Sequence, residues 1–212
     1  FHSCSSLSQI TIPDSVETIS SAVFEDCTSL TSVTIGRNVK SIGNFAFSDC
    51  SALSSVTIKS DNLSEIGYWV FQGCKNLKQI IIPASVNTIG ICAFQGCGLT
   101  SITLPRSVNK IESDAFYNCS NLSNIYCEST AIVEGGYRMF QNNASSRKIY
   151  VPIELLETYK TTSYWSEYSN SLIGFVTATP PNDEIWYTTT NNSTISVSND
   201  IDFGASIVSN TY

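Results

Sequence analysis

The chain has 212 residues, which suits one sizeable domain with room for part of a second. Apolar residues make up an ordinary 42%, but charged residues make up only 14%, below the usual quarter. The formal net charge of −7 argues against nucleic acids and anionic membrane surfaces as partners, because their phosphates require clustered Lys and Arg. No run of about 18 apolar residues occurs, so insertion of this chain into a membrane is not expected.

A repeat organises the first two thirds of the chain. Successive cysteines lie 23, 23, 24, 23 and 22 residues apart, at Cys4, Cys27, Cys50, Cys74, Cys97 and Cys119. Phenylalanine recurs in phase at Phe1, Phe24, Phe47, Phe71, Phe94, Phe116 and Phe140. Five aliphatic columns keep the same register, beginning at Leu7, Ile10, Ile12, Val16 and Ile19, and Cys127 takes an aliphatic position in the sixth unit. This many registered copies leave almost no room for chance.

Each unit predicts one long and one short extended segment. The pattern L-x-x-I-x-I is typical of a strand, and a proline ends it in three copies, Pro13, Pro83 and Pro105. The pattern S-V-x-x-I-G then turns into a shorter segment, where a glycine permits a positive φ or a close backbone approach (Gly43, Gly67, Gly90). One coil cannot bury these columns alone, whereas coils stacked about 4.8 Å apart can. The expected fold is a β-rich repeat solenoid with a parallel sheet, a right-handed coil of about 23 residues per turn.

Four regions follow from the pattern. Residues 1–146 are the predicted solenoid, whose first residues repeat the end of a unit, so an earlier coil is expected upstream. Residues 147–176 are the predicted C-terminal cap, with a last strand, a short helix around Leu155, Leu156 and Tyr159, and an aromatic face of Tyr164, Trp165 and Tyr168. Residues 177–183 read as a linker. Residues 184–212 hold two alternating runs around Asn191-Asn192, which predict a hairpin that begins a second, truncated module.

The unit resembles the BspA-like leucine-rich repeat of bacterial and protist surface proteins. The resemblance covers roughly residues 1–175, and the motif is specific, although Gly135 stands where the fifth column expects Ile and indicates a degenerating sixth unit. The resemblance implies adhesion to host proteins and cells. It also implies an extracellular or cell-surface location and a protein or glycan partner on a host or neighbouring cell.

The cysteines admit three interpretations. Zinc sites favour close pairs such as C-x₂-C, and none occurs. Disulfides need Cα separations of about 4.4–6.8 Å, which stacked coils permit, but parallel neighbours in one column point the same way. A structural ladder of small, buried, reduced thiols is the favoured interpretation. Cys92 stands outside the ladder, in a variable position, and is predicted to be either the most reactive thiol or a link between two copies of the chain.

Catalytic constellations are weak. His2 is the only histidine, and a dyad with Cys4 would lack a third group to orient it. Asp26 and Asp49 recur one coil apart as a glycosidase pair would, but a turn preference explains them better, because Gly and Asn take the same position elsewhere. We therefore predict no catalysis, no cofactor and no metal.

Exposed positions are the candidate ligand-binding residues. Gln79, Ile81, Asn124 and Tyr126 lie between core columns of the long strand, and Phe45, Tyr68 and Trp69 lie in or beside a second variable column. These side chains predict a monomeric protein that binds a macromolecule. Two alternatives stay open: the aromatics cover the coil edge or pack on neighbouring loops, or the chain is a structural stalk or spacer that displays another domain.

Overall fold

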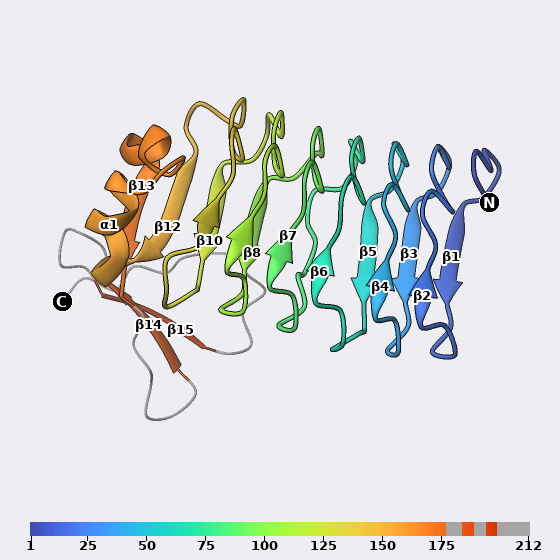
Figure 1. Cartoon of the computed structure of the whole chain (residues 1–212), viewed down its shortest axis with the longest axis horizontal. Coiled ribbons are helices and arrows are strands. Elements are labelled where there is room, and N and C mark those ends of the chain that lie inside the picture. Colours follow the sequence, from blue (N-terminus) through green and yellow to red (C-terminus); the bar gives the residue numbers. More distant parts are fainter. Residues whose placement is uncertain (177–183, 189–193, 199–212) are drawn as a thin grey trace.

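The computed structural model of the chain describes residues 1–176, 184–188 and 194–198. Residues 1–176 form an elongated solenoid, with coils stacked side by side from the N-terminus to a helical region at the far end (Figure 1). The predicted β-rich solenoid with parallel strands is confirmed.

The long strands form two parallel sheets. One sheet contains β1 (Gln9–Ile12), β3 (Ser32–Ile35) and β5 (Ser55–Ile58), and the other contains β8 (Ser101–Leu104), β10 (Asn124–Cys127), β12 (Lys148–Pro152) and β13 (Leu172–Phe175). Pairing is in register, so that Ile12 lies beside Ile35 and Ile35 beside Ile58. Equivalent side chains of successive coils therefore form the continuous columns that the repeat predicts.

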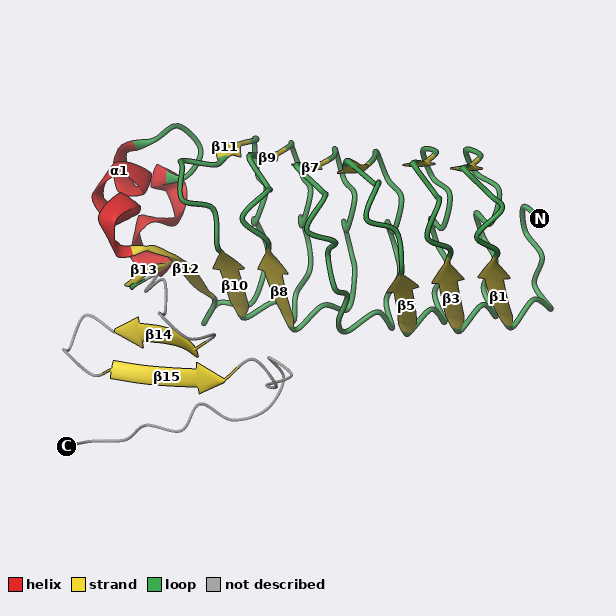
Figure 2. Cartoon of the chain, turned by 90° about the horizontal axis from the view of Figure 1, so that it is seen from below, coloured by secondary structure: helices red, strands yellow, loops and turns green. Residues whose placement is uncertain are grey.

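The short strands run along the opposite side of the coil (Figure 2). β2 (Thr18–Ile19) pairs with β4 (Ser41–Ile42). β6 (Glu65–Ile66), β7 (Thr88–Ile89), β9 (Lys110–Ile111) and β11 (Glu134–Gly135) form a second parallel set. Each short strand except β11 places an isoleucine in the core and its other residue at or near the surface.

A third set of inter-coil hydrogen bonds lies between each short strand and the following cysteine. Phe45 N donates to Tyr68 O at 3.1 Å, and Asp49 N donates to Gln72 O at 2.7 Å. This ladder needs two residues of positive φ per coil, such as Phe45 at 61° and Asp49 at 55°. From the second unit on, the position before each ladder cysteine, or before Asn143 in the last coil, holds Asp, Gly or Asn, which adopt this conformation most readily (Asp26, Asp49, Gly73, Gly96, Asn118, Asn142).

The glycines after the short strands serve close packing between coils. A Cβ on Gly43 would collide with the backbone nitrogen of Ser21, and one on Gly90 would lie 2.8 Å from the carbonyl carbon of Gly67. Neither glycine has a positive φ. Of the two roles that the sequence allowed, the structure therefore shows the close backbone approach at Gly43 and Gly90.

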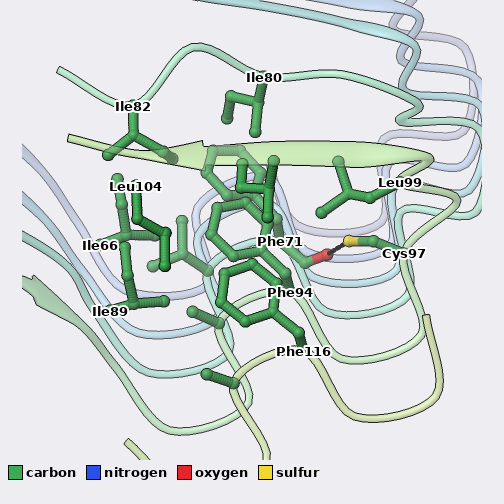
Figure 3. Close-up of a cluster of buried hydrophobic side chains, with 14 of the residues drawn as sticks. Ile66, Phe71, Ile80, Ile82, Ile89, Phe94, Cys97, Leu99, Leu104 and Phe116 are labelled. Atoms are coloured by element: carbon green, nitrogen blue, oxygen red, sulfur yellow. Dashed lines mark hydrogen bonds between the residues drawn. The ribbon is translucent and has the colours of Figure 1, made fainter. Parts of the chain in front are cut away.

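The core is a set of stacked columns with phenylalanine at its centre. Neighbouring phenylalanine rings lie 5.3–5.6 Å apart between centroids, and their planes differ by no more than 23°. Figure 3 shows Phe71, Phe94 and Phe116 in this stack, with Leu99 and Ile89 beside it. Truncating one buried ring, as in Phe94→Ala, should cost about 3–5 kcal/mol.

Both strand ladders are interrupted next to the unit between Cys50 and Cys74, which carries an extra residue. β4 does not pair with β6, and residues 78–82 form no strand within the described part of the chain. The prediction of a long strand in every coil is therefore wrong for the segment that holds Gln79 and Ile81. The extra residue lies in the turn at residues 59–62, where Ser60 Oγ donates to Val39 O and accepts from Asn62 N. Ile80 and Ile82 stay buried although their segment forms no strand.

The C-terminal region closes the last coil. After β12 come η1 (Ile153–Leu155), α1 (Leu156–Thr161) and η2 (Ser166–Ser171), followed by β13, a strand that the sequence did not predict. The hydroxyl of Tyr159 accepts from Val133 N at 3.0 Å, and the hydroxyl of Tyr168 accepts from Phe140 N at 3.2 Å. In earlier coils the phenylalanine N–H donates to the next coil. The Tyr168 hydroxyl thus accepts a hydrogen bond from the Phe140 N–H, which has no carbonyl of a further coil in this ladder as its partner.

Gly135 is explained by Trp165 rather than by a decaying repeat. A Cβ on Gly135 would lie 2.8 Å from Trp165 Nε1 and 3.0 Å from Met139 Cε. The fully buried indole donates to Val133 O at 2.7 Å and contacts the Phe140 ring edge to face. The missing isoleucine side chain therefore makes the space that Trp165 occupies.

The predicted hairpin region contains β14 (Glu184–Thr188) and β15 (Thr194–Ser198), which pair antiparallel. The predicted linker, the residues that join the two strands and residues 199–212 lie outside the described residues, and the second module stays a prediction. In the described part of the chain, no helix is long and apolar enough to cross a bilayer.

Candidate functional site

The predicted binding residues fall into two groups on different sides of the coil. Gln79, Ile81, Asn124 and Tyr126 belong to the side of the long strands, whereas Phe45, Tyr68 and Trp69 follow the short strands (Figure 2). The structure therefore does not bring all seven residues into one site.

On the long-strand side, the ring of Tyr126 stacks on Tyr150 of the next coil, with centroids 4.7 Å apart and planes 8° apart. Burial raises the pKa of both hydroxyls, and the proximity of Tyr150 raises the pKa of Tyr126 further, so both stay neutral. Ile81, in the interrupted segment, is 87% exposed. The sequence prediction did not include Tyr150, although it lies in phase with Tyr126.

On the other side, the predicted aromatic residues pack on one another. Phe45 and Trp69 stack with centroids 4.8 Å apart and planes 5° apart, and the ring of Tyr68 meets Trp69 edge to face at 5.9 Å. Phe45 and Trp69 remain half-buried and Tyr68 is exposed. These rings cover the coil edge, as one alternative held, yet they still present aromatic surface to solvent.

Backbone hydrogen bonds fix two parallel rows on this edge. Trp69 N donates to Ile91 O, and the equivalent bonds of the next two coils reach Ser113 O and Tyr137 O. The outer row is thus Ser21, Asn44, Tyr68, Ile91, Ser113 and Tyr137, one residue per coil. The left-handed column beside it holds Ala22, Phe45, Trp69, Cys92, Asp114 and Arg138, all with φ between 54° and 61°.

Large side chains in the left-handed column oppose the backbone preference. A residue other than Gly, Asn or Asp with positive φ costs about 1–3 kcal/mol. The position before the cysteine avoids this cost by using Asp, Gly and Asn, whereas this column uses Phe45 and Trp69. The rings of Phe45 and Trp69 therefore occupy this column although its left-handed conformation disfavours large side chains.

Cys92 is not the accessible thiol that its variable position suggested. It is only 8% exposed. Burial and the nearby Asp114 carboxylate raise the pKa of its thiol, against a hydrogen bond with Trp69 that lowers the pKa. A thiol is reactive as its thiolate, so the prediction that Cys92 is the most reactive cysteine is wrong. Cys4 is the half-buried thiol of the chain.

A hollow of about 220 Å³ lies further along the same edge. Ile91, Ser113 and Tyr137 of the outer row line it, together with neighbouring backbone and Tyr164 from the turn before η2. At its side, Lys110 Nζ lies 3.3 Å from Glu112 Oε1 and 3.7 Å from Glu134 Oε1. The hydrogen bond to Glu112 and the charge of Glu134 raise the pKa of Lys110, so this amine stays protonated.

One departure from the repeat in the sequence coincides with this hollow. Four other coils place Gly after the short strand, but the coil between Cys97 and Cys119 has Glu112 there. The next two residues, Ser113 and Asp114, are also polar, and Asp114 forms an ion pair of 2.9 Å with Arg138. The guanidinium of Arg138 in turn lies 4.9 Å from the centre of the Tyr137 ring.

Comparison with known proteins matches the BspA type leucine-rich repeat region, in six copies, to residues 1–97 and 54–170. The chain belongs to the BspA-type leucine-rich repeat family. A leucine-rich repeat protein of T. pallidum has a similar structure, with a TM-score of 0.60 and 25% identity over 74% of this chain and 84% of its own. No match was found among curated proteins.

Two more solved structures share the fold. A leucine-rich repeat protein from Eubacterium ventriosum has a TM-score of 0.55 and 24% identity, over 65% of this chain and 43% of its own. The pneumococcal vaccine antigen PcpA has a TM-score of 0.55 and 20% identity, over 77% of this chain and 39% of its own. The leucine-rich repeat solenoid is generally a non-catalytic binding scaffold.

In this BspA-type chain, the repeated cysteines act as hydrogen-bond donors between coils. Cys97 Sγ donates to the carbonyl oxygen of Phe71 in the preceding coil at 2.9 Å (Figure 3). The equivalent bond is made by Cys27, Cys50, Cys74 and Cys119. In the last coil Asn143 takes the cysteine position and donates to Phe116 O at 2.7 Å. The ladder therefore needs a small buried donor rather than sulfur chemistry.

The thiols themselves are free and suited to a structural role. All eight cysteines are unpaired by disulfides. Burial raises the pKa of Cys50, Cys97 and Cys127 well above the ordinary value, and raises the pKa of Cys119 to about 12. Within the described residues, no group of three or more His, Cys, Asp or Glu side chains is placed to hold a metal ion.

Proposed function

We propose that this chain is a non-catalytic binding module, extracellular or displayed on a cell surface, that holds a macromolecular ligand on its aromatic edge. The aromatic edge comprises Phe45, Tyr68, Trp69, Ile91, Tyr137 and Tyr164. Membership of the BspA-type family and a solenoid fold support a binding role. A surface rich in Ser, Thr and Asn and poor in charge supports an extracellular setting.

The observation that carries the proposal is the stacked pair of Phe45 and Trp69 in the left-handed column. Their backbone conformation disfavours large side chains, yet both rings are kept, at the one-coil spacing that stacks them. Rigid aromatic side chains lose little conformational entropy on binding, and they dominate the energetics of many interfaces. An edge of pre-stacked rings therefore supplies anchors for a partner.

Binding to a panel of matrix proteins and glycans, measured on a sensor surface, tests this proposal. Trp69→Asn is the informative variant, because Asn tolerates the left-handed conformation and removes the ring without straining the backbone. We expect it to weaken binding at least about tenfold, as loss of an interface anchor does. Tyr126→Ala, on the opposite side of the coil, is the matched control and should leave affinity unchanged.

Two results would overturn the proposal. One is absence of binding across the panel, which would favour the alternative of a spacer that displays another domain. The other is loss of binding in Tyr126→Ala with full binding in Trp69→Asn, which would move the ligand to the long-strand side. Thermal unfolding of each variant separates these outcomes from a loss of fold.

A further inference from the structure

We infer that the hollow between Ile91 and Tyr137 binds one neutral sugar residue, and that the macromolecular partner of the aromatic edge is therefore a glycan. This inference rests on the proposed function and names the ligand chemistry for one end of the same edge. The size, the lining and the charge of the hollow carry it.

The hollow has the dimensions of a single ring. Ile91 and Tyr137 stand two coils apart in the outer row, roughly 9.6 Å at the usual strand spacing, with the small Ser113 between them. One layer of atoms in contact with a wall on each face needs about 7–8 Å. The volume of about 220 Å³ is below the roughly 300–1,000 Å³ of sites for drug-sized ligands. A pyranose chair fits this space, and a larger ligand would have to extend out of it along the edge.

The lining combines apolar walls with mixed hydrogen-bonding groups. Tyr137 and Tyr164 are 52% and 43% exposed and offer ring surface to the apolar C–H face of a sugar. Lys110 supplies donors, Glu134 supplies acceptors, and the hydroxyl of Ser113 does both. A sugar hydroxyl also donates and accepts, so a polyhydroxylated ring can pair with every one of these groups.

The charge of the hollow selects against ionic ligands. Lys110, Glu112 and Glu134 together carry −1, and the adjacent Asp114–Arg138 ion pair adds nothing. This balance disfavours sialic and uronic acids. A cationic ligand is disfavoured as well, because the Lys110 ammonium already lies between the two carboxylates that would attract it.

Two local departures from the repeat coincide at this hollow. The coil that contributes Lys110 and Ser113 to the lining replaces the usual Gly by Glu112, and it places Ser113 between two large residues of the outer row. Tyr164, which also lines the hollow, has a φ of 62°, a conformation that costs a tyrosine about 1–3 kcal/mol, and it remains partly exposed. Both features are accounted for if the hollow holds a ligand.

Titration of the labelled protein, followed by NMR, tests the inference. The probes are glucose, galactose, mannose and N-acetylglucosamine as neutral sugars, and N-acetylneuraminic and glucuronic acid as acidic ones. We expect at least one neutral sugar to shift the signals of Ser113, Tyr137 and Tyr164, and to bind at least tenfold more tightly than either acid.

Ser113→Tyr should fill the hollow and abolish these shifts, because the outer row already accepts tyrosine at Tyr68 and Tyr137. Ser21→Tyr makes the same substitution in the same row, away from the hollow, and should leave the shifts unchanged. No response to any neutral sugar, tighter binding of an acidic sugar, or full binding by Ser113→Tyr would overturn the inference.

The failure of this inference can be told apart from failure of the proposed function. If Trp69→Asn weakens a macromolecular ligand while neutral sugars leave Ser113 and its neighbours unperturbed, the aromatic edge binds and the sugar site is refuted. If no macromolecule binds but a neutral sugar does so at the hollow, the sugar site stands without the wider edge.

Discussion

Gly135→Ile restores the residue that the repeat expects, yet we predict that it destabilises the protein. In the other coils an isoleucine at this position packs on its neighbours in the fifth column. Here the space belongs to Trp165, whose Nε1 would lie 2.8 Å from the first carbon of any new side chain. The substitution therefore makes the repeat residue compete with Trp165 of the C-terminal cap for the same space.

The magnitude follows from what the indole would lose. Trp165 is fully buried, donates a hydrogen bond of 2.7 Å to Val133 O, and contacts the rings of Phe140 and Tyr159. If the indole shifts slightly, the cost is that of overpacking, about 1–3 kcal/mol. If it is expelled, the cost approaches that of Trp→Ala, about 3–5 kcal/mol. We expect the larger figure, which lowers the melting temperature by roughly 6–20 °C in a chain of this size.

A double-mutant cycle in urea provides the assay. Gly135→Ile and Trp165→Ala are measured singly and together, and the pair should cost about 1–3 kcal/mol less than the sum, because the isoleucine refills space that the indole vacates. Gly67→Ala serves as control, since its new Cβ would find ordinary contacts of 3.5 Å or more. A neutral Gly135→Ile, or strict additivity in the cycle, would refute the explanation of Gly135 by the cap.

Two further predictions concern the ladders. The buried thiols have folded-state pKa values above the unfolded value of 9.0, so their contribution is fully present below pH 9 and is lost as pH rises. Between pH 9 and its folded pKa, each thiol should lower the unfolding free energy by about 1.4 kcal/mol per pH unit. Cys119→Asn, which copies the natural donor Asn143, should remove one such contribution in urea titrations at pH 8, 9 and 10. An unchanged slope of the unfolding free energy against pH in this variant would contradict the prediction. Gly96→Ala should cost about 1–2 kcal/mol for the left-handed conformation alone, because nothing lies within 4 Å of its new Cβ. Gly43→Ala should cost more, because its new Cβ would force neighbouring coils apart. The reverse order of stability in thermal unfolding would be inconsistent with the close approach at Gly43.

Much of the fold could be predicted because the solenoid repeats its contacts. A residue such as Ile89 meets its own equivalents in the neighbouring coils, so a column in the sequence becomes a column in the core. The cysteine position is also readable from its period. The period does not reveal that the cysteine donates a hydrogen bond to the phenylalanine carbonyl. That role depends on where the third set of inter-coil hydrogen bonds places each carbonyl.

The misses concern features that no single unit determines. The strand at residues 78–82 is absent although Leu77, Ile80 and Ile82 keep the repeat pattern. The extra residue in the preceding turn does not account for it, because an extra residue in the equivalent turn before β11 leaves both ladders paired. The meaning of Gly135 depends on Trp165, thirty residues later. The hollow depends on three coils and Tyr164 together, so periodicity alone could show only that Glu112 departs from the pattern.

The interrupted strand ladders have a mechanical consequence. The short strands are unpaired between β4 and β6, and the long strands are unpaired one coil contact later, between β5 and residues 78–82. At each of these two contacts the other strand ladder persists, as do the backbone bonds of the left-handed column, such as those of Phe45 and Trp69. Each contact is therefore held on two sides of the coil, so neither should act as a hinge under load. The spacing between the rings of Phe45 and Trp69 should change little when the solenoid is pulled along its length.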